Sequence, residues 1–243
     1  MTSKQDLFVV PGMEIDLGLI TGIKDENSQT ENSEESAVIL GPGLFEKNSK
    51  ILSFAAGNIA TNFKDTIWVN YNKKRYIPEV SESIIGTVVA RTAEGYKVDI
   101  GSAQPANLNG LSFENATKRN RPNLSVGTIV YAKVVLSNKY IEPEIECFNR
   151  NTGKADGYGE LEDGFVIKAS LGYCFKLFKG TALILELLGN HIAYELAVGL
   201  NGFVWVKAGS PETTILVANA IKNAEHLSES DCALMVKQLV SFL

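Results

Sequence analysis

Positively charged side chains gather between Asn115 and Lys139, a stretch of sequence that contains no carboxylate. Five cations lie in it: Lys118, Arg119, Arg121, Lys133 and Lys139. A second basic group stands directly before Tyr76: Lys73, Lys74 and Arg75. Ammonium and guanidinium groups bind phosphates, and guanidinium does so through a fork of parallel N–H donors. The pattern therefore predicts contact with a phosphate backbone such as RNA, centred on the string ATKRNRP (residues 116–122).

The overall charge hides this basic region. The chain has 243 residues and a formal net charge of −5. Seven carboxylates and one lysine lie between Glu14 and Glu35, a net charge of −6, so the other residues together carry +1. Local charge rather than total charge determines where a polyanion binds. A solvated surface loop, or a contact with an acidic protein, remains the alternative for ATKRNRP.

Residues that could carry catalysis or hold a metal are few and scattered. The chain has three cysteines and two histidines: Cys147, Cys174, Cys232, His191 and His226. They form no CxxC pair and no spacing typical of zinc, so we expect neither a metal nor a cofactor. Glu144 and Glu146 are expected to be solvated charges on a strand. No catalytic residue is assigned, although a hydrolase that uses Cys174 with His191 remains an alternative.

Apolar runs are short throughout the chain. None approaches the roughly 20 residues that span a bilayer. The run Leu7 to Val10, closed by Pro11 and Gly12, is too short for a secretory signal. An intracellular protein without a membrane partner is therefore expected.

Short β-type runs fill the first part of the chain, up to Tyr76. They are Ala37–Leu40, Ile51–Ala55 and Thr66–Tyr71, and they are separated by polar turns. The stretch 25–36 (DENSQTENSEES) has no apolar residue, so we expect it to be a mobile surface loop. Residues 1–76 are predicted to form a small β domain, and Tyr76 is expected to pack at its end rather than to stack on a base.

Five strand-like runs lie between Ile77 and Cys147: Ile84–Arg91, Tyr96–Ile100, Ala106–Leu111, Thr128–Leu136 and Ile141–Cys147. The polar connection 112–127, which contains ATKRNRP, separates the third run from the fourth. Five short strands with one long connection are typical of an OB-type barrel, and a piece of a β-sandwich is the alternative. Pro143 has no N–H, so the fifth strand is expected to be a sheet edge at that point.

The last part of the chain has strand and helix patterns in the order β-α-α-β-β-α, which is typical of a KH domain. Asn201-Gly202 lies between two apolar runs, and we expect a hairpin in which both residues take a positive φ. The string Gly199-Leu200-Asn201-Gly202 is similar to the GxxG loop with which KH domains hold RNA, but it lies between strands. The predicted helix–helix connection, Phe178–Thr181, has one glycine, so the usual RNA clamp is expected to be missing.

Several strings resemble the RNA-binding cap subunits of the eukaryotic RNA exosome. Within these, the chain is similar to the KH-bearing subunit of the ribosomal-RNA-processing series that has GxNG in place of GxxG. The strings span nearly the whole chain in order: Val10-Pro11-Gly12, Leu40–Gly43, Lys74–Pro78, Ile85-Gly86, Asn115–Pro122, Glu144–Phe148, Gly159–Gly164 and Val198–Val206. The acidic stretch 25–36 has no counterpart in the family and is expected to be an insertion.

The resemblance implies a multidomain chain, mainly β with an α+β part. It implies a small N-terminal β domain (residues 1–76), a five-stranded OB-fold barrel (77–150) and a C-terminal KH domain (151–243). It also implies that Lys118, Arg119 and Arg121 face the entrance of a central channel through which RNA passes. Lys133, Lys139 and the basic group before Tyr76 are expected to extend the track. The GxNG motif and a nearby tryptophan are expected to be structural: Gly199, Asn201, Gly202 and Trp205.

The resemblance further implies a non-catalytic subunit. With other cap subunits it would sit on a ring of RNase-PH-like subunits and guide single-stranded RNA toward an associated 3′-to-5′ exoribonuclease. The expected location is the nucleus, nucleolus and cytoplasm. A free-standing OB/KH factor in translation or RNA chaperoning is the other binding-protein alternative.

Overall fold

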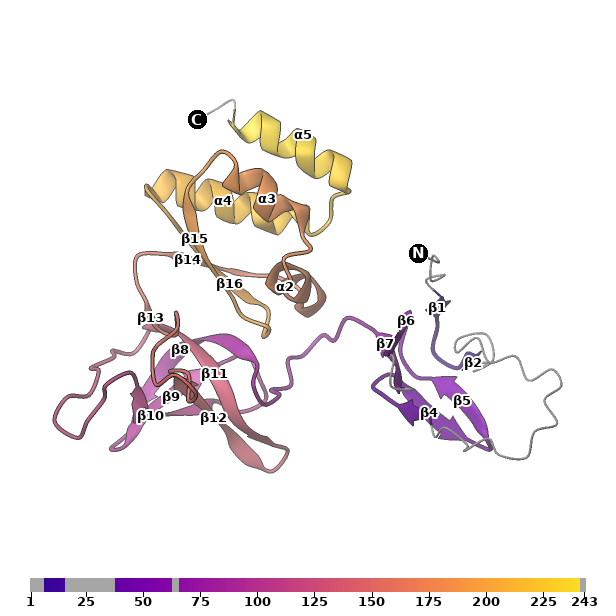
Figure 1. Cartoon of the computed structure of the whole chain (residues 1–243), viewed down its shortest axis with the longest axis horizontal. Helices are drawn as coiled ribbons and strands as arrows, with labels where there is room; N and C mark the ends of the chain where they lie inside the picture. The colour runs from indigo at the N-terminus through magenta and orange to yellow at the C-terminus, as the bar shows by residue number, and fades with distance from the viewer. Residues whose placement is uncertain (1–6, 16–37, 63–65, 241–243) are drawn as a thin grey trace. The chain divides into compact units, whose positions relative to one another are not determined.

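The computed structural model describes residues 7–15, 38–62 and 66–240. The chain divides into two compact units, Met1–Asn72 and Lys73–Leu243. Figure 1 shows the path of the chain through both units. The acidic stretch 25–36 lies outside the described residues.

The first unit consists of two small sheets, in which all strand pairs are antiparallel except the parallel pair β3–β7. One has the strand order β1-β6-β7-β3 and the other β2-β5-β4. The strands are short: β1 (Phe8–Val9), β2 (Glu14–Ile15), β3 (Ile39–Leu40), β4 (Leu44–Lys47), β5 (Lys50–Ser53), β6 (Gly57–Asn62) and β7 (Thr66–Asn70). The longer strands bury alternate side chains, as in β7, where Ile67 and Val69 are 1% and 2% exposed. These residues form a core with Val9, Ile15 and Leu44.

The second unit begins with a closed barrel. Its strands are β8 (Ser83–Arg91), β9 (Gly95–Asp99), β10 (Ala106–Phe113), β11 (Ile129–Asn138) and β12 (Ile141–Cys147), with the short β13 (Gly159–Leu161) added beside β11. The order is β12-β10-β9-β8-β11-β13, and an extra pairing of β12 with β11 closes the ring. Closure distinguishes a barrel from a sandwich. The predicted OB-type barrel is therefore confirmed.

Alternation of inward and outward side chains explains the barrel core. Val130, Ala132 and Val134 of β11 point inward and are at most 1% exposed, while the residues between them are half-buried. They pack with Val98 and Leu108 of neighbouring strands. A period of two residues puts every second side chain on one face, so the apolar pattern that predicted these strands also fills the barrel.

The expectation that β12 is an edge at Pro143 holds only locally. From Glu144 onward the strand pairs on both sides, with β11 and with β10. The register with β11 shifts between Leu136 and Asn138, next to the proline. An irregular ladder accommodates a residue without an N–H, and the rest of the strand remains inside the closed sheet.

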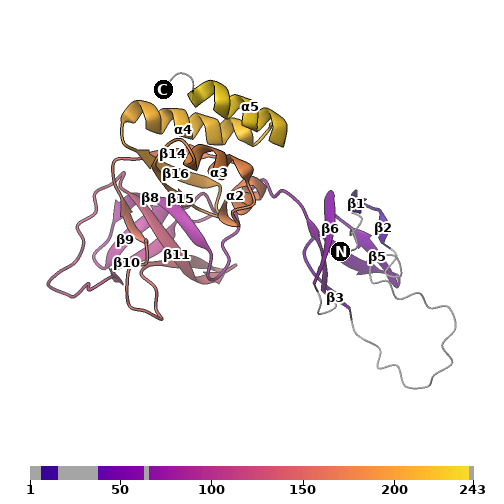
Figure 2. The ribbon, with the colours of Figure 1, turned by 45° about the horizontal axis from the view of Figure 1, so that its top comes forward.

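A KH-type α+β domain follows the barrel. Its three-stranded sheet has the order β14-β16-β15, formed by β14 (Phe165–Lys168), β15 (Tyr194–Val198) and β16 (Phe203–Ala208). Four helices accompany it: α2 (Leu171–Phe178), α3 (Leu183–Gly189), α4 (Pro211–Ala224) and α5 (Glu229–Val240). Figure 2 shows α4 and α5 on one side of this sheet. Ser210 caps α4, and Pro211 occupies its first turn.

Candidate nucleic-acid interface

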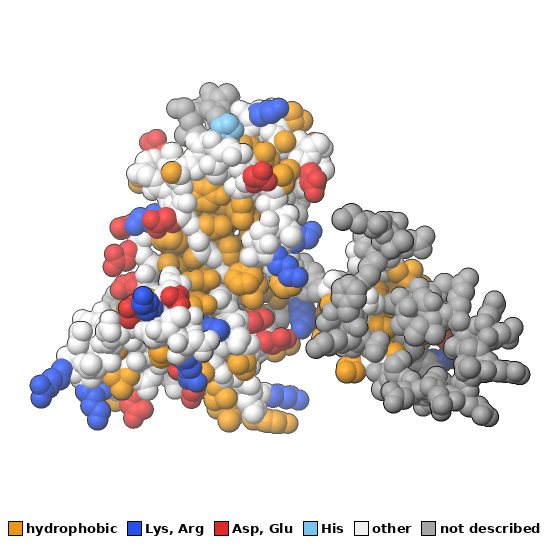
Figure 3. Space-filling model, in the orientation of Figure 1, with side chains coloured by type: hydrophobic (Ala, Val, Ile, Leu, Met, Phe, Trp, Pro, Cys, Tyr) orange, Lys and Arg blue, Asp and Glu red, His pale blue; other side chains and the backbone are white. Residues whose placement is uncertain are grey.

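The connection from β10 to β11 presents the central cations of the predicted site. Lys118, Arg119 and Arg121 all lie in it, and all three side chains are exposed. In Figure 3, blue side chains project at the lower left, where this connection leaves the barrel. Three cations on one surface loop provide an electrostatic site that a phosphate backbone can reach without burying charge.

Contacts with the barrel hold this connection in place. The Tyr96 hydroxyl on β9 donates to the carbonyl oxygen of Pro122 (2.5 Å) and accepts from the N–H of Leu124 (3.1 Å). Leu124 is 2% exposed and belongs to the barrel core. One buried leucine and one bridging hydroxyl therefore fix the chain directly after the cations.

Further hydrogen bonds order the loop itself. Thr117 and Asn120 exchange backbone bonds of 3.0 and 3.1 Å, so Lys118 and Arg119 occupy the tip of a closed turn. Nη2 of Arg91 donates to Oδ1 of Asn123 at 2.7 Å. A cation on a preorganised loop loses less conformational entropy when it binds than one on a mobile chain.

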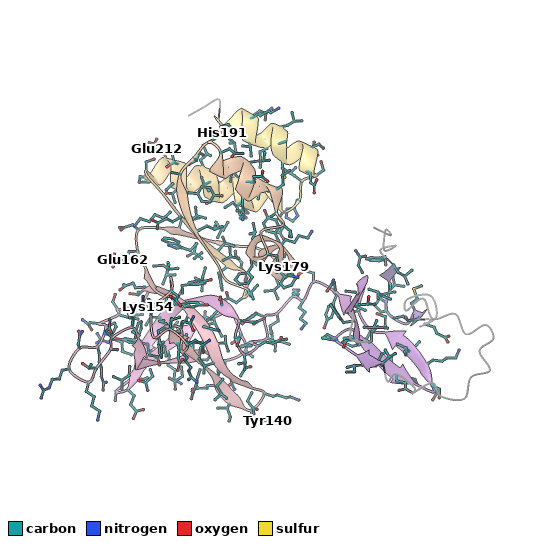
Figure 4. All side chains as sticks on the ribbon, viewed as in Figure 1. Tyr140, Lys154, Glu162, Lys179, His191 and Glu212 are labelled. Atoms are coloured by element: carbon teal, nitrogen blue, oxygen red, sulfur yellow. The ribbon has the colours of Figure 1, made fainter. Side chains whose placement is uncertain are left out.

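The other predicted cations do not join this cluster. Lys133 lies half-buried in the middle of β11, where its register partners are Ser83 of β8 and Glu146 of β12. Lys139 is exposed at the β11–β12 turn, with its Nζ 5.8 Å from the ring centre of Tyr140. A strand rises about 3.3 Å per residue, so this turn is at the opposite end of β11 from the basic connection. Figure 4 labels Tyr140 at that end of the hairpin.

The basic group before Tyr76 opens the second unit. Lys74 and Arg75 are exposed and Lys73 is half-buried. Tyr76 itself is 6% exposed within the barrel core, and its hydroxyl donates to Oε2 of Glu82 at 2.6 Å. Burial and this carboxylate raise the pKa of the Tyr76 hydroxyl. The prediction that Tyr76 packs rather than stacks on a base is confirmed.

The GxNG motif connects the KH domain to the barrel. Oδ1 of Asn201 accepts from the N–H of Ile85 at 3.1 Å. Its Nδ2 donates to the carbonyl oxygens of Ile85 (2.6 Å) and Ile100 (2.9 Å). Asn201 is 4% exposed, so an RNA strand cannot reach it. The Asn201 side chain is thus bonded to the barrel backbone, which is consistent with the structural role expected for the motif.

The geometry of this hairpin differs from the expected two-residue turn. Only Gly202 takes a positive φ (+88°), while Asn201 does not. Gly202 N–H donates to Gly199 O and Gly199 N–H to Phe203 O, which describes a longer loop that ends in a left-handed glycine. The expectation of a positive φ at both Asn201 and Gly202 was wrong, because the Asn201 side chain is directed at the barrel instead.

Close approach explains the first glycine of the motif. A Cβ on Gly199 would lie 2.3 Å from Oδ1 of Asn201 and 2.8 Å from the nitrogen of Ile85. Next to it, Trp205 is 5% exposed and packs with Ile85 and Ala197. Together these residues form a buried junction between barrel and KH domain, so the two parts are expected to move as one body.

The corner where KH domains clamp RNA has different chemistry here. Between α2 and α3, Gly180 takes a positive φ of +67°, and no second glycine follows it. Nζ of Lys179 lies 4.3 Å from the ring centre of Phe175. The chain therefore lacks the two-glycine turn that brings a KH backbone close to a nucleotide.

The geometry does not support a Cys174/His191 nucleophile pair. Cys174 lies on α2 and is fully buried, and burial raises the pKa of its thiol to about 12. His191 is exposed beyond α3, where Figure 4 labels it at the top of the KH domain. A thiol with this pKa is almost entirely protonated near neutral pH, whereas the thiolate is the nucleophile.

Residues 7–15, 38–62 and 66–240 contain neither a metal-binding cluster nor a membrane-spanning helix. Within these ranges, no three His, Cys, Asp or Glu side chains are grouped so that they could hold a metal ion. Over the same part of the chain, no helix is long and apolar enough to cross a bilayer.

Sequence reasoning missed the residues that position the cations. The sequence pattern indicates only that Tyr96 belongs to a strand and that Leu124 belongs to a polar connection. Leu124 is one of few large apolar residues in the connection 112–127, together with Phe113 and Val126, and this was the available signal for an anchor. The bridging role of the Tyr96 hydroxyl had no signal in the sequence, because it depends on how β9 and the connection meet in space.

Two family models match the second unit. Residues 76–159 match the S1 domain of "Exosome complex component RRP40", and residues 164–212 match a KH domain. A solved crystal structure assigned to an exosome complex RNA-binding protein is 20% identical, with a TM-score of 0.55 over 70% of this chain and 95% of that one. At this identity, the likeness supports the fold alone.

Relatives extend the match to most of the chain. The exosome complex component rrp40 of Schizosaccharomyces pombe is 44% identical over 216 residues, which cover 87% of this chain and 90% of that protein. Exosome complex component RRP40 of Homo sapiens is 36% identical over 198 residues, covering 79% of this chain and 72% of the relative. These matches confirm the resemblance found in the sequence: the chain belongs to the RRP40 family of exosome complex components.

Proposed function

We propose that this chain is a non-catalytic, RNA-binding cap subunit of the RNA exosome. It would sit with other cap subunits on the RNase-PH-like ring and guide single-stranded RNA into the central channel, toward an associated exoribonuclease. RNA degradation and ribosomal RNA processing would follow, in the nucleus, nucleolus and cytoplasm. Membership of the RRP40 family supports the assembly, and the printed names of the relatives are those of exosome components.

One observation carries the RNA-guiding role. Lys118 and Arg119 occupy the tip of a closed, exposed turn, and Arg121 follows it just before the chain is anchored by Pro122 and Leu124. Phosphate contacts of this kind give affinity without sequence readout, because they release counterions and do not touch base edges. Such a loop suits RNA that must move past the subunit.

The remaining assignments of the proposal follow from position. Lys133, Lys139 and the group Lys73–Arg75 would add long-range attraction rather than contacts in the same cluster. The junction at Asn201 and Trp205 would hold the barrel in a fixed orientation relative to the KH domain. Domain limits of 1–76, 77–150 and 151–243 are kept as part of the proposal.

The test uses the assembled complex. Exosome reconstituted with Lys118→Glu and Arg121→Glu should protect single-stranded RNA from added nuclease at least about tenfold less well, since charged hydrogen bonds each contribute on the order of 1–3 kcal/mol. A control with Lys222→Glu and Lys237→Glu, two exposed helix positions, changes total charge equally. Both variants should assemble with the ring. Equal protection by both at matched salt would refute the proposed role.

A free-standing RNA-binding factor is the competing function. Its distinguishing result would be purification of this chain from native extract without ring subunits. The exosome proposal predicts instead that ring and cap subunits copurify with it in fixed proportion.

A further inference from the structure

The β10–β11 connection with Lys118, Arg119 and Arg121 is called the basic loop. A second connection, between β12 and β13, carries two further cations, Arg150 and Lys154. Arg150 is already engaged, because its Nε and Nη2 donate to the two carboxylate oxygens of Glu146 at 2.7 and 2.6 Å. Lys154 is exposed and, within the described ranges, forms no ion pair. Lys154 is therefore the cation of this connection that is available to a ligand.

Hydrogen bonds hold the connection around Lys154 in one conformation. The N–H of Asn149 donates to the carbonyl oxygen of Lys154 at 2.8 Å, and the N–H of Gly153 donates to the carbonyl oxygen of Asn149 at 2.8 Å. Oδ2 of Asp156 accepts from Nδ2 of Asn149 (2.8 Å) and from the hydroxyl of Thr152 (2.9 Å). The backbone of the β12–β13 connection is therefore held on both sides of Lys154.

One carboxylate joins this connection to the basic loop. Oε2 of Glu114 accepts from the N–H of Ala155 at 2.8 Å. Glu114 is the first residue after β10 and directly precedes the loop that carries Lys118, Arg119 and Arg121. Residues 41 positions apart in sequence thus meet at the base of that loop. In Figure 4, Lys154 lies on the barrel on the side toward the KH domain.

Two carboxylates of this substructure, Glu114 and Asp156, accept hydrogen bonds from it, and both residues remain exposed. These hydrogen bonds engage one oxygen of each carboxylate, and Lys154 is exposed to solvent. An RNA strand that continues from the basic loop along the barrel would meet a lysine at this point. Lysine suits such a contact, since it binds phosphate as a point charge and does not require one fixed orientation.

We propose that Lys154 is a further phosphate contact of the RNA-binding surface, and that Glu114 is the positioning residue that holds it beside the basic loop. The inference rests on the proposed function. It adds a second segment to the RNA-binding surface, the β12–β13 connection, which is distant from the basic loop in sequence. The ligand is a phosphodiester of single-stranded RNA.

The first test measures RNA affinity of the assembled complex as a function of salt, with an unstructured oligoribonucleotide as probe. Lys154→Ala should weaken binding about two- to fivefold, as for an exposed charge contact. It should also reduce the slope of log affinity against log salt by about 0.7, the value for one phosphate on a single strand. Lys222→Ala, the exposed control on α4, should change neither quantity.

The second test separates the position of the lysine from its charge. Glu114→Gln keeps an oxygen that can accept from Ala155 but removes a negative charge, so RNA affinity should stay equal or rise. Glu114→Ala removes the acceptor as well, and RNA affinity should fall although a negative charge is lost. Simple electrostatics predicts that both variants bind RNA equally or more tightly than the parent.

The outcomes distinguish this inference from the proposed function. Loss of RNA capture with Lys118→Glu and Arg121→Glu, but an unchanged salt slope with Lys154→Ala, would overturn the Lys154 contact alone. A Glu114→Ala variant that binds as tightly as Glu114→Gln would overturn the positioning role. If the loop variant also captures RNA normally, the proposed function itself fails.

Discussion

Asn201 supplies Ile85 with the pair of hydrogen bonds that a neighbouring strand would otherwise provide. The amide accepts from the backbone N–H of Ile85 and donates to its carbonyl oxygen, across 116 positions of sequence. A third hydrogen bond, to the carbonyl oxygen of Ile100, joins the same side chain to the end of a second barrel strand, β9. One amide thereby fixes the KH hairpin on the barrel that carries the basic loop.

Replacement of this amide should loosen the junction. Asn201→Ala leaves the N–H and C=O of Ile85 and the C=O of Ile100 buried without their partner, which should lower the free energy of unfolding by about 2–4 kcal/mol. Urea denaturation of the purified chain measures this change. Asn223→Ala, at an exposed position of α4, should stay within about 0.5 kcal/mol of the parent. Equal stability of the two variants would contradict the structural role of the motif.

The hydroxyl of Tyr96 should matter for the order of the basic loop. Tyr96→Phe removes the partner of the buried Leu124 N–H and should cost about 1–3 kcal/mol of stability. Amide hydrogen exchange in residues 115–124 should become faster, although every cation of the loop is retained. Tyr140→Phe is the matched control, because Tyr140 is 84% exposed. Unchanged exchange in the Tyr96 variant would show that the loop is held in another way.

The buried thiols make the protein sensitive to alkaline pH. Burial raises the pKa of Cys147 and Cys174 to about 12 each, above the ordinary value of 9.0. The folded chain therefore keeps protons that the unfolded chain releases between about pH 9 and 12, so the stability from these thiols is complete below pH 9 and falls as the pH rises through this window. Thermal unfolding measured from pH 8 to 11 should show the decline.

Alkylation gives a separate check on the same thiols. At pH 8, iodoacetamide should leave Cys174 unmodified in the folded chain and modify it after denaturation, as read by mass spectrometry. Rapid modification of Cys174 in the folded protein would instead restore the nucleophile alternative.

The isolated chain should bind RNA weakly. Its basic loop offers three cations and Lys154 adds a fourth, so the slope of log affinity against log salt should be about −3 for a single strand, at about 0.7 per phosphate. Fluorescence anisotropy with oligoribonucleotides of different sequence should give similar, weak affinities. Tight binding to one sequence would require base contacts that the loop does not provide.

Five strand-like runs and one long polar connection were sufficient to predict the barrel. In β11 the sequence predicted the strand but not its inward set Val130, Ala132 and Val134, because Tyr131 and Val135 are apolar as well. The β-α-α-β-β-α pattern similarly predicted the KH domain. Two-residue strands such as β1 and β2 were not predicted, because two residues carry no period. The position of the strand β13 also could not be read, since its three residues pair only in the presence of β11.

The site was predictable in its charges but not in its supports. Lys118, Arg119 and Arg121 stand together in the sequence and remain together in space. Lys154 reaches the same region only through the bond between Ala155 and Glu114, and such a long-range contact leaves no local pattern. The turn at Asn201 was misjudged for the same reason, because a partner far away in sequence decides its conformation.

The central claim is that the basic loop touches RNA on its way into the complex. A photo-crosslinking amino acid at position 119, in reconstituted exosome engaged with single-stranded RNA, tests this most directly. The same group at position 215, an exposed residue of α4, serves as the control. We expect strong RNA crosslinks from position 119 and background levels from position 215, and the account would be contradicted by background levels at 119 in a complex that still binds RNA.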